Sequence, residues 1–147
     1  MILRAVTPAD GAALADVHAS AFDAAWTAKE LIRFASDAGA IALAAEDGAL
    51  AGFILCRAIA GETEVLTLAV RPAARRQGVA RALLEAALLL AAQTTDAAFL
   101  EVAEDNPGAI VLYEGAGFER VGRRAGYYAR AHAPSVAAIV MRRALNS

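Results

Sequence analysis

The segment from Gly78 to Thr94 constrains the fold more than any other part of this sequence. Its spacing predicts a helix, and large apolar side chains lie on nearly every side of that helix, at Val79, Leu83, Leu84, Leu88, Leu89 and Leu90. A helix that is apolar all round is stable only when neighbouring structure covers it. Since strand-like runs lie before and after it, we expect the helix to be buried against a sheet.

Seven segments have the composition and spacing of β-strands. They cover residues 2–5, 41–45, 50–57, 62–70, 98–103, 118–128 and 136–143. Asp47 and Gly48, between the second and third segments, predict a hairpin turn. Pro72 ends the fourth segment, because proline cannot donate a hydrogen bond to a β-ladder. We expect the last two strands to be antiparallel.

Three further segments open with helix-start signals. Thr7 and Pro8 combine an N-cap with a proline at the first helical position, Thr27 and Glu30 match a capping box, and Asn106 precedes the last helix. The order β-α-α-β-β-β-α-β-α-β-β indicates an α/β (α+β) fold with a mixed central sheet of about seven strands and helices on both faces. No repeat or linker divides the chain, so we expect residues 1–147 to form a single domain.

Composition argues against a membrane protein. Hydrophobic residues make up 59% of the chain and the mean hydropathy is +0.45, but much of this excess is alanine, which favours helices rather than membrane insertion. The most apolar run, residues 86–92, is far shorter than the roughly 20 residues that span a bilayer. The first residues also lack the apolar core of a signal peptide. We expect a soluble, cytoplasmic protein with no membrane partner.

Cysteine and histidine are too few for a metal centre or a disulfide. Cys56 is the single cysteine, and its apolar surroundings in the sequence favour a buried structural thiol. The two histidines, His18 and His132, are too few for a histidine-based metal site. We expect no metal and interpret His18 as a packed side chain.

Arginine supplies 13 of the 14 basic residues, although the net charge is only −2, so we expect no direct nucleic-acid binding. Residues 71–81 contain no acid and carry Arg71, Arg75, Arg76 and Arg81. Gly78 allows the backbone to approach a ligand closely, and the free N–H groups of the following helix favour an anion such as a pyrophosphate. The alternative is a solvated turn. We interpret the arginines of the C-terminal part as a solvated face rather than a docking site for an acidic partner.

A second candidate site combines Glu101 with Tyr113. Glu101 lies in an otherwise apolar strand, where we expect its pKa to tend upward, as suits a general base. Tyr113 lies about two turns into the helix that follows Asn106, where a phenol could donate a proton to a leaving group. The alternative is that Glu101 faces water on an edge strand and Tyr113 is a core aromatic.

The combination and order of these features resemble a known family. R-x-x-G-x-A lies at a strand-to-helix junction, followed by L-E-V and then by N-P-x-A-x-x-L-Y-E-x-x-G-F. Together they resemble the GNAT superfamily of acetyl-CoA-dependent N-acetyltransferases, and most closely its bacterial RimI type, which acetylates the N-terminal amine of a ribosomal protein.

The resemblance implies roles for the candidate residues, with acetyl-CoA as cosubstrate. Glu101 would be the general base, through a water, and Tyr113 the acid that protonates the departing thiolate. Asn106 would contact the cofactor arm. The pantetheine arm would pair with the backbone of Leu68, Ala69 and Val70. The pyrophosphate loop would comprise Arg75, Arg76, Gln77, Gly78, Val79, Ala80 and Arg81.

The acceptor side departs from the RimI type. Ala103 and Asp105 stand where that type usually has Arg and Ser, and Ser135, Val136 and Ala137 replace a common acidic pair, which leaves peptide specificity open. Substrate-binding candidates are Trp26, Tyr127 and Tyr128, although Trp26 and one of the two tyrosines could simply be packed aromatics. The expected acceptor is a protein N-terminal amine, the alternatives are a small-molecule amine or a non-catalytic acetyl-CoA sensor, and a monomer or weak homodimer is expected.

Overall fold

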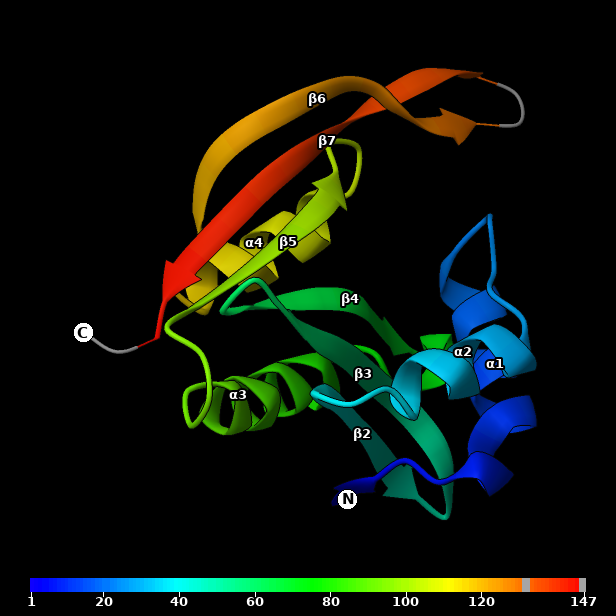
Figure 1. The fold of residues 1–147 in the computed structure, drawn as a ribbon. Coiled ribbons are helices and arrows are strands. Elements are labelled where there is room, and N and C mark those ends of the chain that lie inside the picture. Colours follow the sequence, from blue (N-terminus) through cyan, green and yellow to red (C-terminus); the bar gives the residue numbers. More distant parts are fainter. Residues whose placement is uncertain (131–132, 146–147) are drawn as a thin grey trace.

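One seven-stranded sheet runs through the structure, a computed structural model that describes residues 1–130 and 133–145 (Figure 1). The elements follow the predicted order, which confirms the mixed α/β fold. They are β1 (Ile2–Ala5), a 3₁₀ turn (Pro8–Asp10), α1 (Gly11–Ala21), α2 (Ala28–Ala35), β2 (Ala40–Asp47), β3 (Ala49–Ile59), β4 (Glu62–Val70), a second 3₁₀ turn (Pro72–Ala74), α3 (Val79–Ala91), β5 (Ala97–Ala103), α4 (Pro107–Gly115), β6 (Glu119–Arg130) and β7 (Ala133–Ala144).

The strands lie in the order β1-β2-β3-β4-β5-β7-β6. Neighbouring strands are antiparallel, as predicted for the closing pair β6 and β7, except for β4 and β5, which run parallel. The parallel step arises because α3 carries the chain from the end of β4 back to the start of β5, as a parallel connection requires.

Helices cover both faces of the sheet, as predicted. On one face, α3 and α4 pack over a core that includes Ile54, Cys56 and Leu100. On the other, α1 and α2 pack over a core that includes Phe53 and Leu55. The central strand β3 therefore sends alternate side chains into two separate cores, which explains why its apolar run is nearly continuous.

Helix α3 is buried against the sheet, as predicted, but on one side only. Leu83 and Leu84 are fully buried, whereas Leu89 is 74% exposed and Leu90 is 42% exposed. Within the described residues, no element covers this outer side, because α3 packs against one sheet face only. The helix also ends at Ala91 rather than near residue 94. No helix of the described part of the chain is long and apolar enough to cross a bilayer.

Strands β4 and β5 separate soon after they begin. Within the described residues their parallel pairing is confined to Thr63 with Ala98 and Glu64 with Phe99. Beyond this point the two strands diverge visibly in Figure 1. On the other side of β4, the register against β3 shifts so that Leu66 is an extra, unpaired residue. A β-bulge bends its strand and increases the local twist, which accounts for the turn of β4 away from β5.

Candidate functional site

The edge of β4 that faces the divergence carries free backbone groups. The Arg71 N–H donates to the Ala51 carbonyl at 2.8 Å, so the backbone of residue 71 faces β3. Because hydrogen-bonding direction alternates along a strand, the N–H and C=O groups of Leu68 and Val70 face the open side. The backbone groups of Ala69 face β3 instead. Of the three residues predicted to pair with a cofactor arm, Leu68 and Val70 therefore have backbone groups on the open side. An extended ligand can add to such an edge as a further strand.

The loop before α3 has the backbone geometry of an anion site. Arg76 and Gly78 both adopt left-handed conformations, with φ of 63° and 78°, and Gly78 is the N-cap of α3. Turns of this kind point successive N–H groups toward one concave side, to which the first free N–H groups of α3 add. A left-handed conformation at a residue other than glycine costs about 1 kcal/mol or more, so Arg76 stores strain where an anion is expected.

Side chains of this loop are tethered by neighbouring groups. Arg75 donates from Nε to the Val70 carbonyl at 3.3 Å and from Nη2 to the Ser20 carbonyl at 3.5 Å. Neutral carbonyls leave the charge of Arg75 available to an anion. Arg81 instead forms an ion pair with Glu85 at 2.9 Å, which offsets its charge and makes it a weaker candidate than the sequence suggested. Gln77 donates to the Ala73 carbonyl at 3.4 Å.

Glu101 lies on β5, on the opposite side of the divergence, and its side chain is 24% exposed. Its Oε2 lies 3.2 Å from Nε of Arg124 on β6. Although these atoms are close, Oε2 is buried and accepts no hydrogen bond from any described residue, so the contact is one of charge. Tyr128 donates its hydroxyl to the Glu101 carbonyl at 3.3 Å. Sequence reasoning missed Arg124 as a partner of Glu101, because only the register of β5, β7 and β6 in the sheet brings the two side chains together.

Tyr113 on α4 is buried, and its ring packs edge to face with Phe118 at a centroid distance of 5.8 Å. Burial raises the pKa of its phenol above the usual range, and the neighbouring Cys56 and Tyr128 groups add to this. The hydroxyl therefore stays protonated and can serve as a donor. Tyr113 is thus a core aromatic, as the alternative interpretation had it.

Trp26 packs between α1 and α2. Its ring stacks on His18 with a centroid distance of 5.1 Å and lies 5.2 Å from the Phe34 ring. The backbone N–H of Trp26 donates to His18 Nδ1 at 3.1 Å. Burial lowers the pKa of His18, which confirms a packed, neutral histidine. No contact in the described part of the chain joins Trp26 to Glu101, so the packed-aromatic interpretation describes its position better.

The adjacent tyrosines of β6 face different surroundings, as the strand pattern predicted. Tyr128 is half-buried against Glu101. Tyr127 is 51% exposed, and the Arg124 guanidinium lies 3.7 Å from its ring centroid. Tyr127, Tyr128, Arg124 and Glu101 therefore form one connected group, which we call the Glu101 cluster.

Arginines of β6 hold the turn between β5 and α4. Arg123 pairs with Glu104 at 2.7 Å and Arg130 pairs with Asp105 at 2.7 Å. Hydrogen bonds from these arginines lower the pKa values of both carboxyl groups. Asn106 caps α4, since its Oδ1 accepts from the Ala109 N–H at 3.2 Å, which leaves its amide NH₂ for a ligand. Arg123 and Arg130 are thus paired with the chain's own carboxylates rather than open to an acidic partner.

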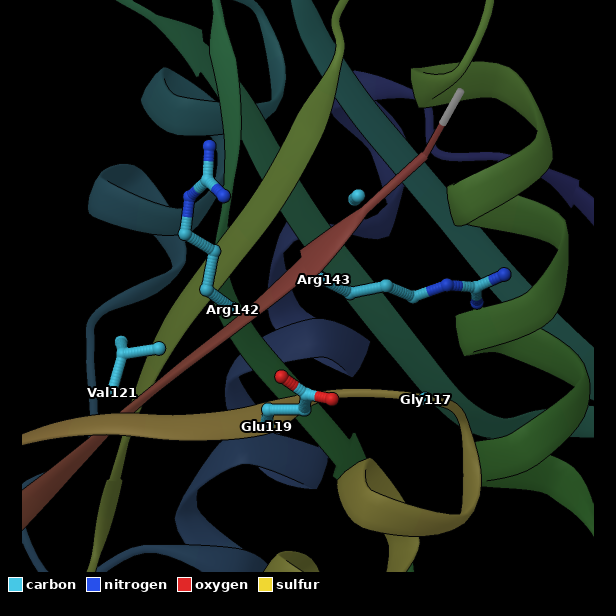
Figure 2. A pocket seen from close by; sticks show the side chains of 6 residues that line it. Gly117, Glu119, Val121, Arg142 and Arg143 are labelled. Atoms are coloured by element: carbon cyan, nitrogen blue, oxygen red, sulfur yellow. The ribbon is translucent and has the colours of Figure 1, made fainter. Parts of the chain in front are cut away.

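Two hollows lie away from Glu101. One, of about 400 Å³, is lined by Gly117, Glu119, Val121, Arg142, Arg143 and Ala144. Figure 2 shows the side chains of Arg142 and Arg143 pointing to opposite sides of β7. Arg142 pairs with Glu62 at 3.0 Å, while Arg143 donates to the Ala116 carbonyl at 2.8 Å. Ligand sites need polar groups that converge, and these diverge. The other hollow lies between α3 and α4.

Cys56 is buried, and burial raises the pKa of its thiol to about 12, so a structural role is confirmed and a nucleophilic one is not supported. Among the described residues, no group of three or more His, Cys, Asp or Glu side chains is arranged to hold a metal ion. His132 lies outside the described residues.

Comparison with known proteins decides the family. The model of the acetyltransferase (GNAT) family matches residues 11–118, from α1 to the residue before β6. The chain belongs to this family. The matched region contains the open edge of β4, the loop before α3, Glu101 and Tyr113, so the resemblance seen in the sequence motifs is confirmed.

Several curated relatives are of the RimI type, which confirms that likeness as well. The ribosomal protein bS18-alanine N-acetyltransferase of Escherichia coli is 36% identical over 84 residues, or 56% of this chain and 57% of that protein. The N-alpha-acetyltransferase RimI of Mycobacterium tuberculosis is 36% identical over 133 residues, or 86% of this chain and 83% of that protein. The match to an uncharacterized Mycobacterium leprae protein, 51% identical over 67 residues, spans 46% of this chain and only 18% of that protein.

Solved structures share the fold over almost the whole chain. The ribosomal-protein-S18-alanine N-acetyltransferase from Escherichia coli superposes with a TM-score of 0.91 at 25% identity, covering 99% of this chain and 94% of that one. Arabidopsis thaliana NAA60 in complex with acetyl-CoA superposes with a TM-score of 0.85 at 19% identity, covering 99% of both chains. The second likeness concerns the fold alone.

Proposed function

We propose that the chain transfers an acetyl group from acetyl-CoA to a primary amine, and that the first-choice acceptor is the N-terminal α-amine of a protein such as a ribosomal protein. The observation that carries the proposal is the position of Glu101 across the divergence from the free edge of β4. Family membership supports the reaction, and the names of the RimI-type relatives support the acceptor class.

The donor would bind along β4. The N–H and C=O groups of Leu68 and the N–H of Val70 suit the amide groups of a pantetheine arm, whereas the Val70 carbonyl already accepts from Arg75. An N–H there can polarise the thioester carbonyl. The loop that contains Arg75, Arg76 and Gly78 suits the pyrophosphate, because its backbone N–H groups, the N-terminus of α3 and two arginine side chains all favour an anion.

Acetyl transfer then needs a base and a proton donor. An α-amine has a pKa of about 8 and is mostly charged at neutral pH, so it must lose a proton before it attacks. Glu101 would accept that proton through a water. The nitrogen lone pair attacks the carbonyl carbon, and the nitrogen releases its second proton to solvent as the C–S bond breaks. The thiolate takes a proton from the Tyr113 hydroxyl, which regains one from solvent. No enzyme nucleophile is needed, in keeping with the buried Cys56.

The test follows CoA-thiol release from acetyl-CoA with a short peptide that has an N-terminal alanine. We expect release and a matching mass gain at the peptide N-terminus. Glu101→Gln and Tyr113→Phe should each lose about a hundredfold or more in kcat while acetyl-CoA still binds. Glu104→Gln removes a neighbouring carboxylate that faces Arg123 instead, so it should keep near-normal turnover.

Other outcomes distinguish the alternatives. Turnover with small amines but not with the peptide would support acetyl transfer and show that the acceptor is a small-molecule amine rather than a protein N-terminus. Tight acetyl-CoA binding without turnover on any amine would favour a sensor. Full activity in both the Glu101 and Tyr113 variants would show that the roles assigned to these residues are wrong.

A further inference from the structure

The carboxylate proposed as the base already has a cation beside it. Arg124 Nε lies 3.2 Å from Glu101 Oε2, and the same guanidinium lies 3.7 Å from the centroid of the Tyr127 ring. The pair is only partly exposed, with 24% of the Glu101 side chain and 48% of the Arg124 side chain accessible. Two of Arg124's favourable contacts are therefore concentrated where an acceptor amine has to arrive.

An incoming ammonium group competes with Arg124 for one carboxylate. Glu101 Oε2 is buried next to the Arg124 guanidinium, so an ammonium group can reach it only by displacing that guanidinium. When an ammonium group takes that position, Arg124 loses its counter-ion. A half-exposed guanidinium that has lost its counter-ion then attracts another anion, with the modest energy of an exposed ion pair.

The neighbouring carboxylates cannot take over the charge of Arg124, because each is bound twice by another arginine. Glu104 accepts from Nε and Nη2 of Arg123 at 2.7 and 3.1 Å. Asp105 accepts from Nε and Nη2 of Arg130 at 3.0 and 2.7 Å. Once Glu101 is engaged by substrate, Arg124 keeps only the face of Tyr127.

We propose that Arg124 is a specificity-determining residue that selects acceptors carrying an anionic group next to the reacting amine. The amine pairs with Glu101 and the anionic group pairs with Arg124, so one ion pair is exchanged for two. The matching protein substrate is an N-terminus whose second residue is Asp or Glu. A basic second residue would instead bring a like charge toward Arg124. Val136, which lies opposite Tyr128 on β7, supplies no carboxylate that could pair with such a basic residue.

This inference rests on the proposed acetyl transfer, and its test uses three peptides that differ only at the second residue. Their sequences begin Ala-Glu, Ala-Gln and Ala-Lys. For the wild-type chain we expect kcat/KM to be about two- to fivefold higher for Ala-Glu than for Ala-Gln, as partly exposed ion pairs allow, and lowest for Ala-Lys. The difference should lie in KM for the peptide and not in KM for acetyl-CoA.

Variants assign the preference to Arg124. Arg124→Gln should make the three peptides nearly equal, whereas Arg124→Lys should keep the order. Arg120→Gln is the matched control, because it removes another exposed arginine of β6, which pairs with Glu114 instead, and should leave the preference intact. Thermal unfolding of each variant shows whether it is folded.

A second arm compares free alanine, which has a carboxylate beside its amine, with alanine amide. If kcat/KM is higher for free alanine than for alanine amide and for every peptide, the result would support the same pairing of an anionic group with Arg124, in a small-molecule acceptor. An unchanged peptide order in folded Arg124→Gln would overturn the inference while leaving acetyl transfer in place. If the wild-type chain acetylates none of the amines, the proposed function fails and the inference fails with it.

Discussion

Gly52 lies on β3 at the point where β4 approaches it most closely. A Cβ at this position would lie 2.8 Å from the Ala69 carbonyl oxygen and 3.1 Å from Val70 Cγ2, closer than nonbonded atoms pack. The absence of a side chain therefore permits the close β3–β4 contact that holds the open edge of β4 in place.

Gly52→Ala should destabilise the chain by about 1–3 kcal/mol, because the backbone of β4 must shift to make room. Chemical denaturation measures this loss. Gly122→Ala on β6 is the matched control: its Cβ would make ordinary contacts at 3.6 Å with Val140, so it should change stability by less than about 0.5 kcal/mol. Equal stability of Gly52→Ala and the wild type would mean that β4 tolerates the shift.

Single residues were predictable where the chemistry is local. Asn106 as a cap and Cys56 as a buried thiol follow from their immediate neighbours in the sequence. The ion pair of Glu101 with Arg124 does not, because it depends on a register that places β7 between β5 and β6. The sequence pointed to Glu101 as an acid among apolar residues, but its partner is 23 positions away.

At the scale of elements, α3 shows the limit of reasoning from composition. Every strand and helix was predicted at about the right place, since β-branched and apolar runs, capping residues and glycines act over a few residues. The buried side of α3 could not be predicted, because leucines occur all round the helix and only the sheet decides which of them face the core. The same holds for the Leu66 bulge, which no local signal marks.

Leu84→Ala should destabilise the chain by about 2–5 kcal/mol, because it leaves a cavity in the core between α3 and the sheet. Leu89→Ala removes the same atoms from the exposed side of the same helix and should cost less than about 0.5 kcal/mol. Denaturation of the two variants in parallel makes the comparison. Similar losses in both would indicate that something covers the outer side of α3 in solution.

For the whole molecule, we expect stability to fall in mild acid because of His18. Burial lowers the pKa of His18 in the folded state, so the unfolded chain binds the proton more readily. Stability is then full above the unfolded pKa of about 6.5 and declines as the pH falls below it. Hydrogen bonds from Arg4 lower the pKa of Asp10 to about 2, so its contribution is lost only in stronger acid, below about pH 4.

Unfolding temperatures measured between pH 7.5 and 4.5 test this expectation. His18→Asn keeps an acceptor near the Trp26 N–H but cannot be protonated, so it should be less sensitive to this pH range than the wild type, even if it is less stable overall. The same pH dependence in both proteins would assign the effect to other groups.

The short junction between β4 and β5 also bears on how such a chain can diversify. One side of it holds β1 to β4 and the loop before α3, where the donor is proposed to bind, and the other side holds β5, β7 and β6, with the Glu101 cluster. Because two residue pairs are all that connect the ladders in the described part of the chain, substitutions in the β6–β7 hairpin disturb few hydrogen bonds on the donor side. Recognition of the acceptor can therefore drift from one lineage to the next while the machinery for the common donor is inherited unchanged.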